Sequence, residues 1–93
     1  MAKPVRMMVL AHCPHCRRAF QIMEELRATH PEYAEVSVEV IDEGEQVELA
    51  NSLDYYYVPT FFVDGVKIHE GVPSEEAVER VFLEALGQTA TVS

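Results

Sequence analysis

An apolar run at residues 5–10 leads directly into a Cys-Pro-His-Cys motif at residues 13–16, and an amphipathic segment follows at once. The run contains a single charge and is typical of a central β-strand that is buried on both faces. Residues 14–29 carry apolar side chains at spacings of three and four, which predicts an amphipathic helix. Pro14 suits the first turn of that helix, where no amide donor is needed. We therefore expect a buried strand to deliver two cysteines to the start of a helix.

The middle of the chain has the patterns of three more strands and a short helix. Valines alternate with polar residues at 36–41, as in a strand with one polar face. An acidic helix of two to three turns is predicted over about 43–53, because its apolar residues recur at helical spacing. Strands are expected at 60–63 and 66–69, and Asp64-Gly65 between them is typical of a hairpin turn.

The last element expected is a helix that begins after Ser74, whose hydroxyl can cap it. Its buried stripe is predicted within 78–86, and Gly87 ends it. Residues 88–93 are predicted to form a polar tail after one domain over residues 1–87. Because a helix joins the first two strands, they should be parallel through a right-handed crossover, whereas the last two should be antiparallel. The expected fold is therefore α/β, with a four-stranded mixed sheet and three helices in the order βαβαββα.

The charge of the chain argues against a nucleic acid or a membrane surface as its partner. Seven basic and 16 acidic residues give a net charge of −9, which would repel phosphate backbones and anionic lipids. Five basic and two acidic residues lie in 1–30, whereas 31–93 hold two basic and fourteen acidic residues. The positive charges therefore gather near the two cysteines.

Three features predict a cytoplasmic location. No run of about 18 apolar residues could span a membrane, and the first apolar run is short and interrupted by Arg6, unlike a secretory signal. The two cysteines are too few and too close in sequence to staple a small secreted fold. We therefore interpret them as a reactive site.

The spacing of the cysteines predicts different roles for their sulfurs. Cys13 stands just before the first helical turn, where unpaired amides and the positive end of the helix favour a thiolate. Cys16 lies within that turn and should be more covered. We expect Cys13 to be the attacking thiolate and Cys16 the resolving thiol, with Pro14, His12 and His15 tuning the pair through local geometry and positive charge.

Two other uses of the cysteine pair remain open. One is a metal-binding module, although a zinc site needs four ligands and the pair supplies two. The histidines beside the pair belong to the same turn, and His69 lies far along the chain. The other is a redox-sensing domain that turns over no substrate. We expect no metal and no other cofactor.

Further motifs make the chain resemble the thioredoxin and glutaredoxin superfamily in its small, glutaredoxin-sized form. Besides the Cys-Pro-His-Cys motif after a strand, Tyr57-Val58-Pro59-Thr60 opens the third strand. The resemblance covers roughly residues 4–87 and implies a thioredoxin fold and a thiol-disulfide oxidoreductase. It also implies that Pro59 is a cis-proline beside the cysteines and that the Val58 backbone pairs with substrate.

The resemblance implies protein disulfides as substrates and thioredoxin reductase or glutathione as the electron donor. We expect the protein to be a monomer. Tyr57, Thr60 and Gly71 are the other substrate-binding candidates. Glutathione-dependent glutaredoxins have Gly-Gly-x-Asp after the last strand, where this chain has Glu70-Gly71-Val72-Pro73. Because Glu70 would repel the anionic tripeptide, thioredoxin reductase is the favoured donor.

Two further departures from thioredoxins affect the site itself. Met7 stands where thioredoxins carry a buried aspartate, and His12 stands where they carry a tryptophan. The aid to proton transfer that the aspartate gives is therefore missing. The run of three tyrosines at 55–57 could form a substrate platform, but we expect at least one of them to serve packing.

Overall fold

The computed structural model describes residues 2–87, and the polar tail predicted at 88–93 lies outside them. Helices and strands follow in the predicted order, with one short 3₁₀ helix, η1, added. The elements are β1 (Val5–Val9), α1 (Pro14–Thr29), η1 (Pro31–Glu35), β2 (Val38–Asp42), α2 (Val47–Asn51), β3 (Thr60–Val63), β4 (Val66–Glu70) and α3 (Glu75–Ala85).

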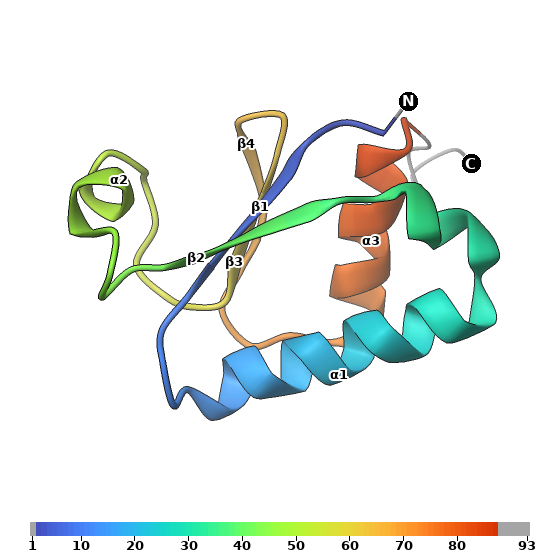
Figure 1. Cartoon of the computed structure of the whole chain (residues 1–93), viewed down its shortest axis with the longest axis horizontal. Coiled ribbons are helices and arrows are strands. Elements are labelled where there is room, and N and C mark those ends of the chain that lie inside the picture. Colours follow the sequence, from blue (N-terminus) through green and yellow to red (C-terminus); the bar gives the residue numbers. More distant parts are fainter. Residues whose placement is uncertain (1, 88–93) are drawn as a thin grey trace.

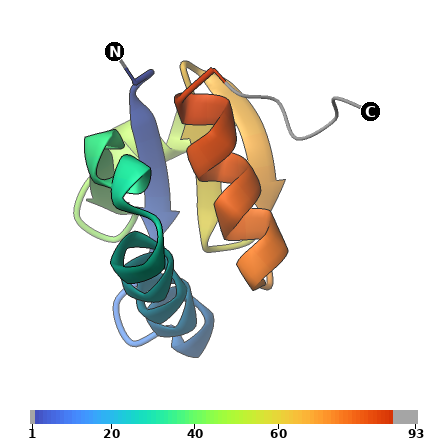
Figure 2. The same ribbon diagram turned by 90° about the vertical axis from the view of Figure 1, so that its right-hand side faces the viewer.

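The strands form one mixed sheet in the order β2-β1-β3-β4. β1 pairs with β2 in parallel and with β3 antiparallel, and β3 pairs antiparallel with β4. α1 and α3 lie on one face of the sheet and α2 lies beyond the other (Figures 1 and 2). The predicted thioredoxin fold, with four strands and helices on both faces, is confirmed. No helix within residues 2–87 is long and apolar enough to cross a membrane.

β1 is buried on both faces, as its apolar run predicts. Val5, Met7 and Val9 pack in the main core against α1 and α3, whereas Met8 packs in a smaller core on the α2 side. The pairing of β1 with β3 runs from Val5 to Met8, so that the last residues of β1 and the first residues of β3 lie at the same end of the sheet. The cysteines follow β1 at this end.

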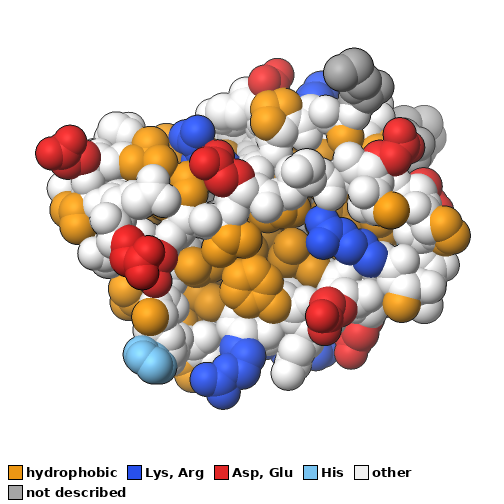
Figure 3. All heavy atoms as spheres, viewed as in Figure 1, with side chains coloured by type: hydrophobic (Ala, Val, Ile, Leu, Met, Phe, Trp, Pro, Cys, Tyr) orange, Lys and Arg blue, Asp and Glu red, His pale blue; other side chains and the backbone are white. Residues whose placement is uncertain are grey.

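The prediction for β2 was partly wrong. The strand expected over 36–41 is Val38–Asp42 instead, and Val40, expected to face the core, is 45% exposed. Ile41, on the opposite face, is fully buried in the smaller core. The reason is that β2 is an edge strand, so that Val40 lies at the rim of the core and, with Phe20 of α1, lines an open groove. Figure 3 shows the apolar surface between β2 and α1.

The helix predicted over about 43–53 was too long. α2 is a single short helix, Val47–Asn51, and Val47, an expected apolar contact, is 52% exposed. A turn precedes the helix, because the Asp42 carboxylate accepts a hydrogen bond from the amide of Gly44 at 2.7 Å. A side chain that bonds nearby backbone amides competes with helix formation.

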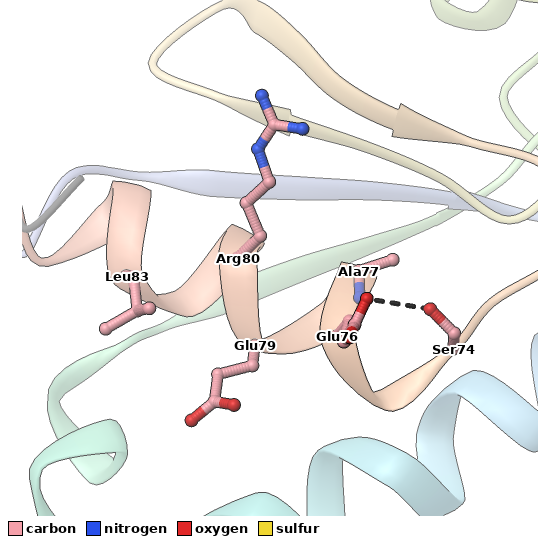
Figure 4. A pocket seen from close by; sticks show the side chains of 6 residues that line it. All are labelled: Ser74, Glu76, Ala77, Glu79, Arg80 and Leu83. Atoms are coloured by element: carbon pink, nitrogen blue, oxygen red, sulfur yellow. Dashed lines mark hydrogen bonds between the residues drawn. The ribbon is translucent and has the colours of Figure 1, made fainter. Parts of the chain in front are cut away.

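α3 begins as predicted. The Ser74 hydroxyl accepts a hydrogen bond from the amide of Ala77 at 3.1 Å, as Figure 4 shows. The same figure shows a shallow hollow along the outer side of α3, and none of its lining residues comes from the cysteine turn. At the other end, Leu86 caps the helix; it is half-buried and packs against the main core, in line with the predicted stripe.

η1 was not predicted, yet it supplies the largest of the fully buried side chains, Tyr33. The Tyr33 ring lies 5.1 Å from that of Phe82, and its hydroxyl donates to Glu79 of α3 at 2.6 Å. Burial and the bond to Glu79 raise the pKa of Tyr33 above its usual value. A single aromatic residue after a helix has no periodicity, so that the sequence gives no signal for this contact.

Candidate active site

The cysteines lie where β1 gives way to α1. After β1 the chain makes a turn in which His12 adopts a left-handed conformation with φ of 67°, a region that histidine enters more readily than most residues. The Cys13 amide donates to the Leu10 carbonyl at 3.3 Å. Cys13 is the extended residue that precedes α1, and Cys16 lies in its first turn.

The two thiols have different surroundings. Both are free; Cys13 is half-buried, whereas Cys16 is 3% exposed and belongs to the main core. Partial burial opposes ionisation of Cys13, but hydrogen bonds from the Cys16 amide, the Cys16 thiol and the His15 amide outweigh it, so that the Cys13 pKa lies below its usual value. Burial raises the pKa of Cys16 to about 11. The geometry therefore separates a half-buried thiol that ionises more readily than usual from a buried thiol that stays protonated at neutral pH.

This difference predicts selective alkylation. At pH 8 we expect iodoacetamide to modify Cys13 at least about fifty times faster than Cys16, because only the thiolate reacts and about one Cys16 in a thousand is ionised three pH units below its pKa. The rates would be measured by peptide mapping with mass spectrometry between pH 6 and pH 10. Faster modification of Cys16 would contradict the predicted order.

The segment before β3 forms the second part of the site. The Val58-Pro59 peptide bond is cis, the Thr60 hydroxyl donates to the Tyr57 carbonyl, and the amide of Gly71 donates to the Pro59 carbonyl at 3.0 Å. Gly71 has a φ of 97°, a conformation that favours glycine. The structure thus brings the five residues expected to bind substrate to the end of the sheet where β1 ends. The side chains of Pro59 and Thr60 are fully buried, so that Thr60 supports this segment from within.

The three tyrosines at 55–57 have two different roles in the structure. Tyr55 packs edge-on against Phe62 and donates its hydroxyl to Glu43 at 2.6 Å, so that it serves packing. Tyr56 and Tyr57 are 84% and 69% exposed. The rings of Tyr56 and Tyr57 are therefore accessible to another molecule.

A sequence model of the thioredoxin domain matches residues 5–83. This chain belongs to the thioredoxin-domain family. The match spans every element from β1 into α3 and includes both cysteines and Pro59.

Solved structures share the fold of this thioredoxin-domain protein at low identity. A protein disulfide oxidoreductase from Aeropyrum pernix K1 is 20% identical with a TM-score of 0.66, and the match covers 97% of this chain and 40% of that one. An N21Q mutant thioredoxin from Halobacterium salinarum NRC-1 is 23% identical with a TM-score of 0.63, over 88% of this chain and 73% of that one. Reduced desulfothioredoxin from Desulfovibrio vulgaris Hildenborough is 19% identical with a TM-score of 0.65, over 90% and 82%. No curated protein sequence matches the chain significantly.

Sequence reasoning missed two acidic residues of this thioredoxin-domain protein. Glu43, expected in a helix, donates its amide to the Val9 carbonyl at the end of β1 at 2.9 Å, and its charge adds to the pKa of both cysteines. Glu70, expected as a free negative charge, pairs with Lys67 at 2.8 Å. The Glu43 contact depends on how a loop packs against the end of β1. Lys67 lies three residues before Glu70 on the same strand, a spacing that places side chains on opposite faces of a regular strand, and β4 is irregular at this point.

The metal-binding alternative has little support in the arrangement of side chains. Within residues 2–87 no three His, Cys, Asp or Glu side chains are grouped closely enough to hold a metal ion. A structural zinc ion needs four such ligands. Cys13 and Cys16 would therefore need two ligands from another molecule.

Proposed function

We propose that this protein is a thiol-disulfide oxidoreductase that reduces or exchanges protein disulfides through the Cys13/Cys16 couple. The observation that carries the proposal is the contrast between the two thiols. A half-buried Cys13 with a lowered pKa stands at the start of α1, one turn from a buried Cys16 whose pKa is raised to about 11. Such a pair supplies a nucleophile and a second thiol held in reserve.

The reaction proceeds in two exchanges. The Cys13 thiolate attacks one sulfur of the substrate disulfide; the S–S bond breaks, and the other substrate sulfur leaves as a thiolate that takes up a proton. Cys16 then loses its proton and attacks the Cys13 sulfur, which releases the second substrate sulfur as a thiol. The substrate gains two electrons and two protons, and the pair is left as the Cys13–Cys16 disulfide. An external dithiol reductant returns the pair to its reduced form.

The charge of Cys13 affects how readily Cys16 ionises for the second exchange. While Cys13 is a thiolate, its charge helps to hold the Cys16 pKa high. Once Cys13 is part of a mixed disulfide it carries no charge, and this contribution is lost. Cys16 therefore ionises more readily when a substrate is attached.

We propose that the substrate is an extended polypeptide segment that pairs with the Val58 backbone beside Pro59. Tyr57 and Gly71 lie beside this point, and the buried Thr60 hydroxyl donates to the Tyr57 carbonyl. Pairing of an extended peptide with the backbone of its binding partner is a common mode of peptide recognition. We propose thioredoxin reductase as the favoured donor over glutathione, and a monomer in a reducing compartment such as the cytoplasm as the working form.

Turnover by the intact protein tests this function. With dithiothreitol as the donor, catalytic amounts of protein should accelerate insulin reduction, measured as turbidity, and protein alkylated beforehand should not. Equilibration with glutathione buffers then measures the reduction potential of the cysteine pair. A potential of about −270 mV indicates a reductant, and one of about −120 mV indicates an oxidant. Failure with insulin and with small disulfides, whatever the donor, would refute the proposal.

A further inference from the structure

Two side chains of β4 hold the loop that leads into the candidate active site. Between α2 and β3, the loop over residues 52–59 has no helix or strand of its own. The ammonium group of Lys67 donates to the Asp54 carbonyl at 3.2 Å. One carboxylate oxygen of Glu70 accepts from the amides of Tyr56 and Tyr57, the latter at 2.9 Å. Side chains of β4 thus satisfy three backbone groups of the loop.

The two side chains also bind each other. The second carboxylate oxygen of Glu70 lies 2.8 Å from the Lys67 nitrogen, and the Glu70 side chain is only 18% exposed. Hydrogen bonds to an ionised acceptor are among the stronger ones in proteins. Lys67 and then the two amides lower the Glu70 pKa to about 2, so that the carboxylate is ionised at neutral pH and accepts from both amides.

The loop held in this way carries the exposed aromatic side chains of the site. Its last residues are Tyr56 and Tyr57, both largely exposed, then Val58 and the buried Pro59. A Cβ atom placed on Gly71 would lie 4.0 Å from that of Tyr57, which shows how closely the loop approaches the end of β4. Glu70 therefore holds the backbone at the two residues that directly precede Val58.

We infer that Glu70 is a positioning residue for protein substrates: together with Lys67 it holds the loop so that the Val58 backbone and the rings of Tyr56 and Tyr57 face the polypeptide around a disulfide. This inference rests on the proposed function. The aromatic rings favour substrates with apolar side chains beside the reacting cysteine. A small disulfide needs only access to Cys13, so that Glu70 should matter for protein substrates alone.

The test compares a protein substrate with a small one. In Glu70→Ala we expect the KM for insulin to rise roughly tenfold, because two charge-assisted hydrogen bonds to the loop are lost. The rate with the small disulfide DTNB should stay within about twofold of wild type, since Cys13 is untouched. Glu76→Ala, which removes an exposed carboxylate from the first turn of α3, serves as the matched control and should change neither.

A conservative variant and a structural readout separate positioning from general damage. Glu70→Gln keeps an oxygen that accepts from the amides. Its KM for insulin should therefore lie much closer to that of the wild type than to that of Glu70→Ala. Amide hydrogen exchange at Tyr56 and Tyr57, followed by NMR, should quicken at least about tenfold in Glu70→Ala, since both amides lose their acceptor. This exchange measurement tests the loop contacts even if the wild type reduces no disulfide, in which case the proposed function itself has failed.

Three outcomes would overturn the inference. The first is an unchanged insulin KM with unchanged amide exchange in Glu70→Ala. The second is an equal loss with insulin and with DTNB, which would indicate a damaged fold. The third is a Glu70→Gln variant as impaired as Glu70→Ala, because the accepting oxygen would then be irrelevant.

Discussion

Cys13→Ser is expected to lower the rate of disulfide reduction by more than about a thousandfold, because a serine hydroxyl is not ionised at neutral pH and cannot form a disulfide. Cys13 is half-buried and free, so that the fold should tolerate the change. The measurement is insulin reduction with dithiothreitol, with a thermal unfolding curve to show that the variant is folded. A variant that keeps a tenth of the wild-type rate would exclude Cys13 as the nucleophile.

The matched variant is Cys16→Ala, which removes the second thiol without placing a hydroxyl in the core around Cys16. It should still attack a substrate disulfide but should stop at the mixed disulfide, because no thiol remains to release the substrate. Intact-mass spectrometry under non-reducing conditions would show the adduct on Cys13. An adduct that forms on Cys16 in the Cys13→Ser variant instead would reverse the assigned roles.

Phe82→Ala is expected to lower the free energy of unfolding by about 3–5 kcal/mol, the usual cost of removing a buried aromatic ring. Phe82 is fully buried in the main core. Its ring packs against Tyr33 of η1, and the Arg27 guanidinium of α1 lies 5.3 Å from the ring centre. One side chain therefore joins three helices. The free energy of unfolding of a small domain is roughly 5–15 kcal/mol in total, so that Phe82→Ala should remove much of the stability.

Urea denaturation followed by circular dichroism measures this loss. Phe20→Ala is the control, because Phe20 lies on α1 and is 38% exposed at the rim of the groove. It should cost about 1 kcal/mol or less, as partly exposed positions usually do. Equal losses in the two variants would mean that Phe82 does not link the helices in the way described.

The reactive pair could be found from sequence because all of its parts are local. A cysteine spacing of three places one thiol before the first helical turn and one within it, and this relation holds for any helix that starts at Pro14. The contribution of Glu70 could not be found in this way. Its partners lie in the loop that precedes β3, and nothing in the sequence links their amides to a carboxylate 13 or 14 residues later.

The limits of the fold prediction have the same origin. Val40 belongs to an alternating pattern that indicates burial, but burial also requires an element above it, and β2 lies at the edge of the sheet. Tyr33 shows the reverse, since no pattern marks it and the contact with α3 buries it.

Local sequence patterns predicted α1 from Pro14 to about Thr29, β3 over residues 60–63, the Asp64-Gly65 turn and the place of both cysteines, because these depend on periodicity and on turn chemistry between near neighbours. The tertiary structure alone decided which valines are covered, how far apart the two thiol pKa values lie, and which side chains hold the loop before Pro59. Those properties depend on burial and on hydrogen bonds between segments distant in the chain, which exist only once the sheet and helices have packed.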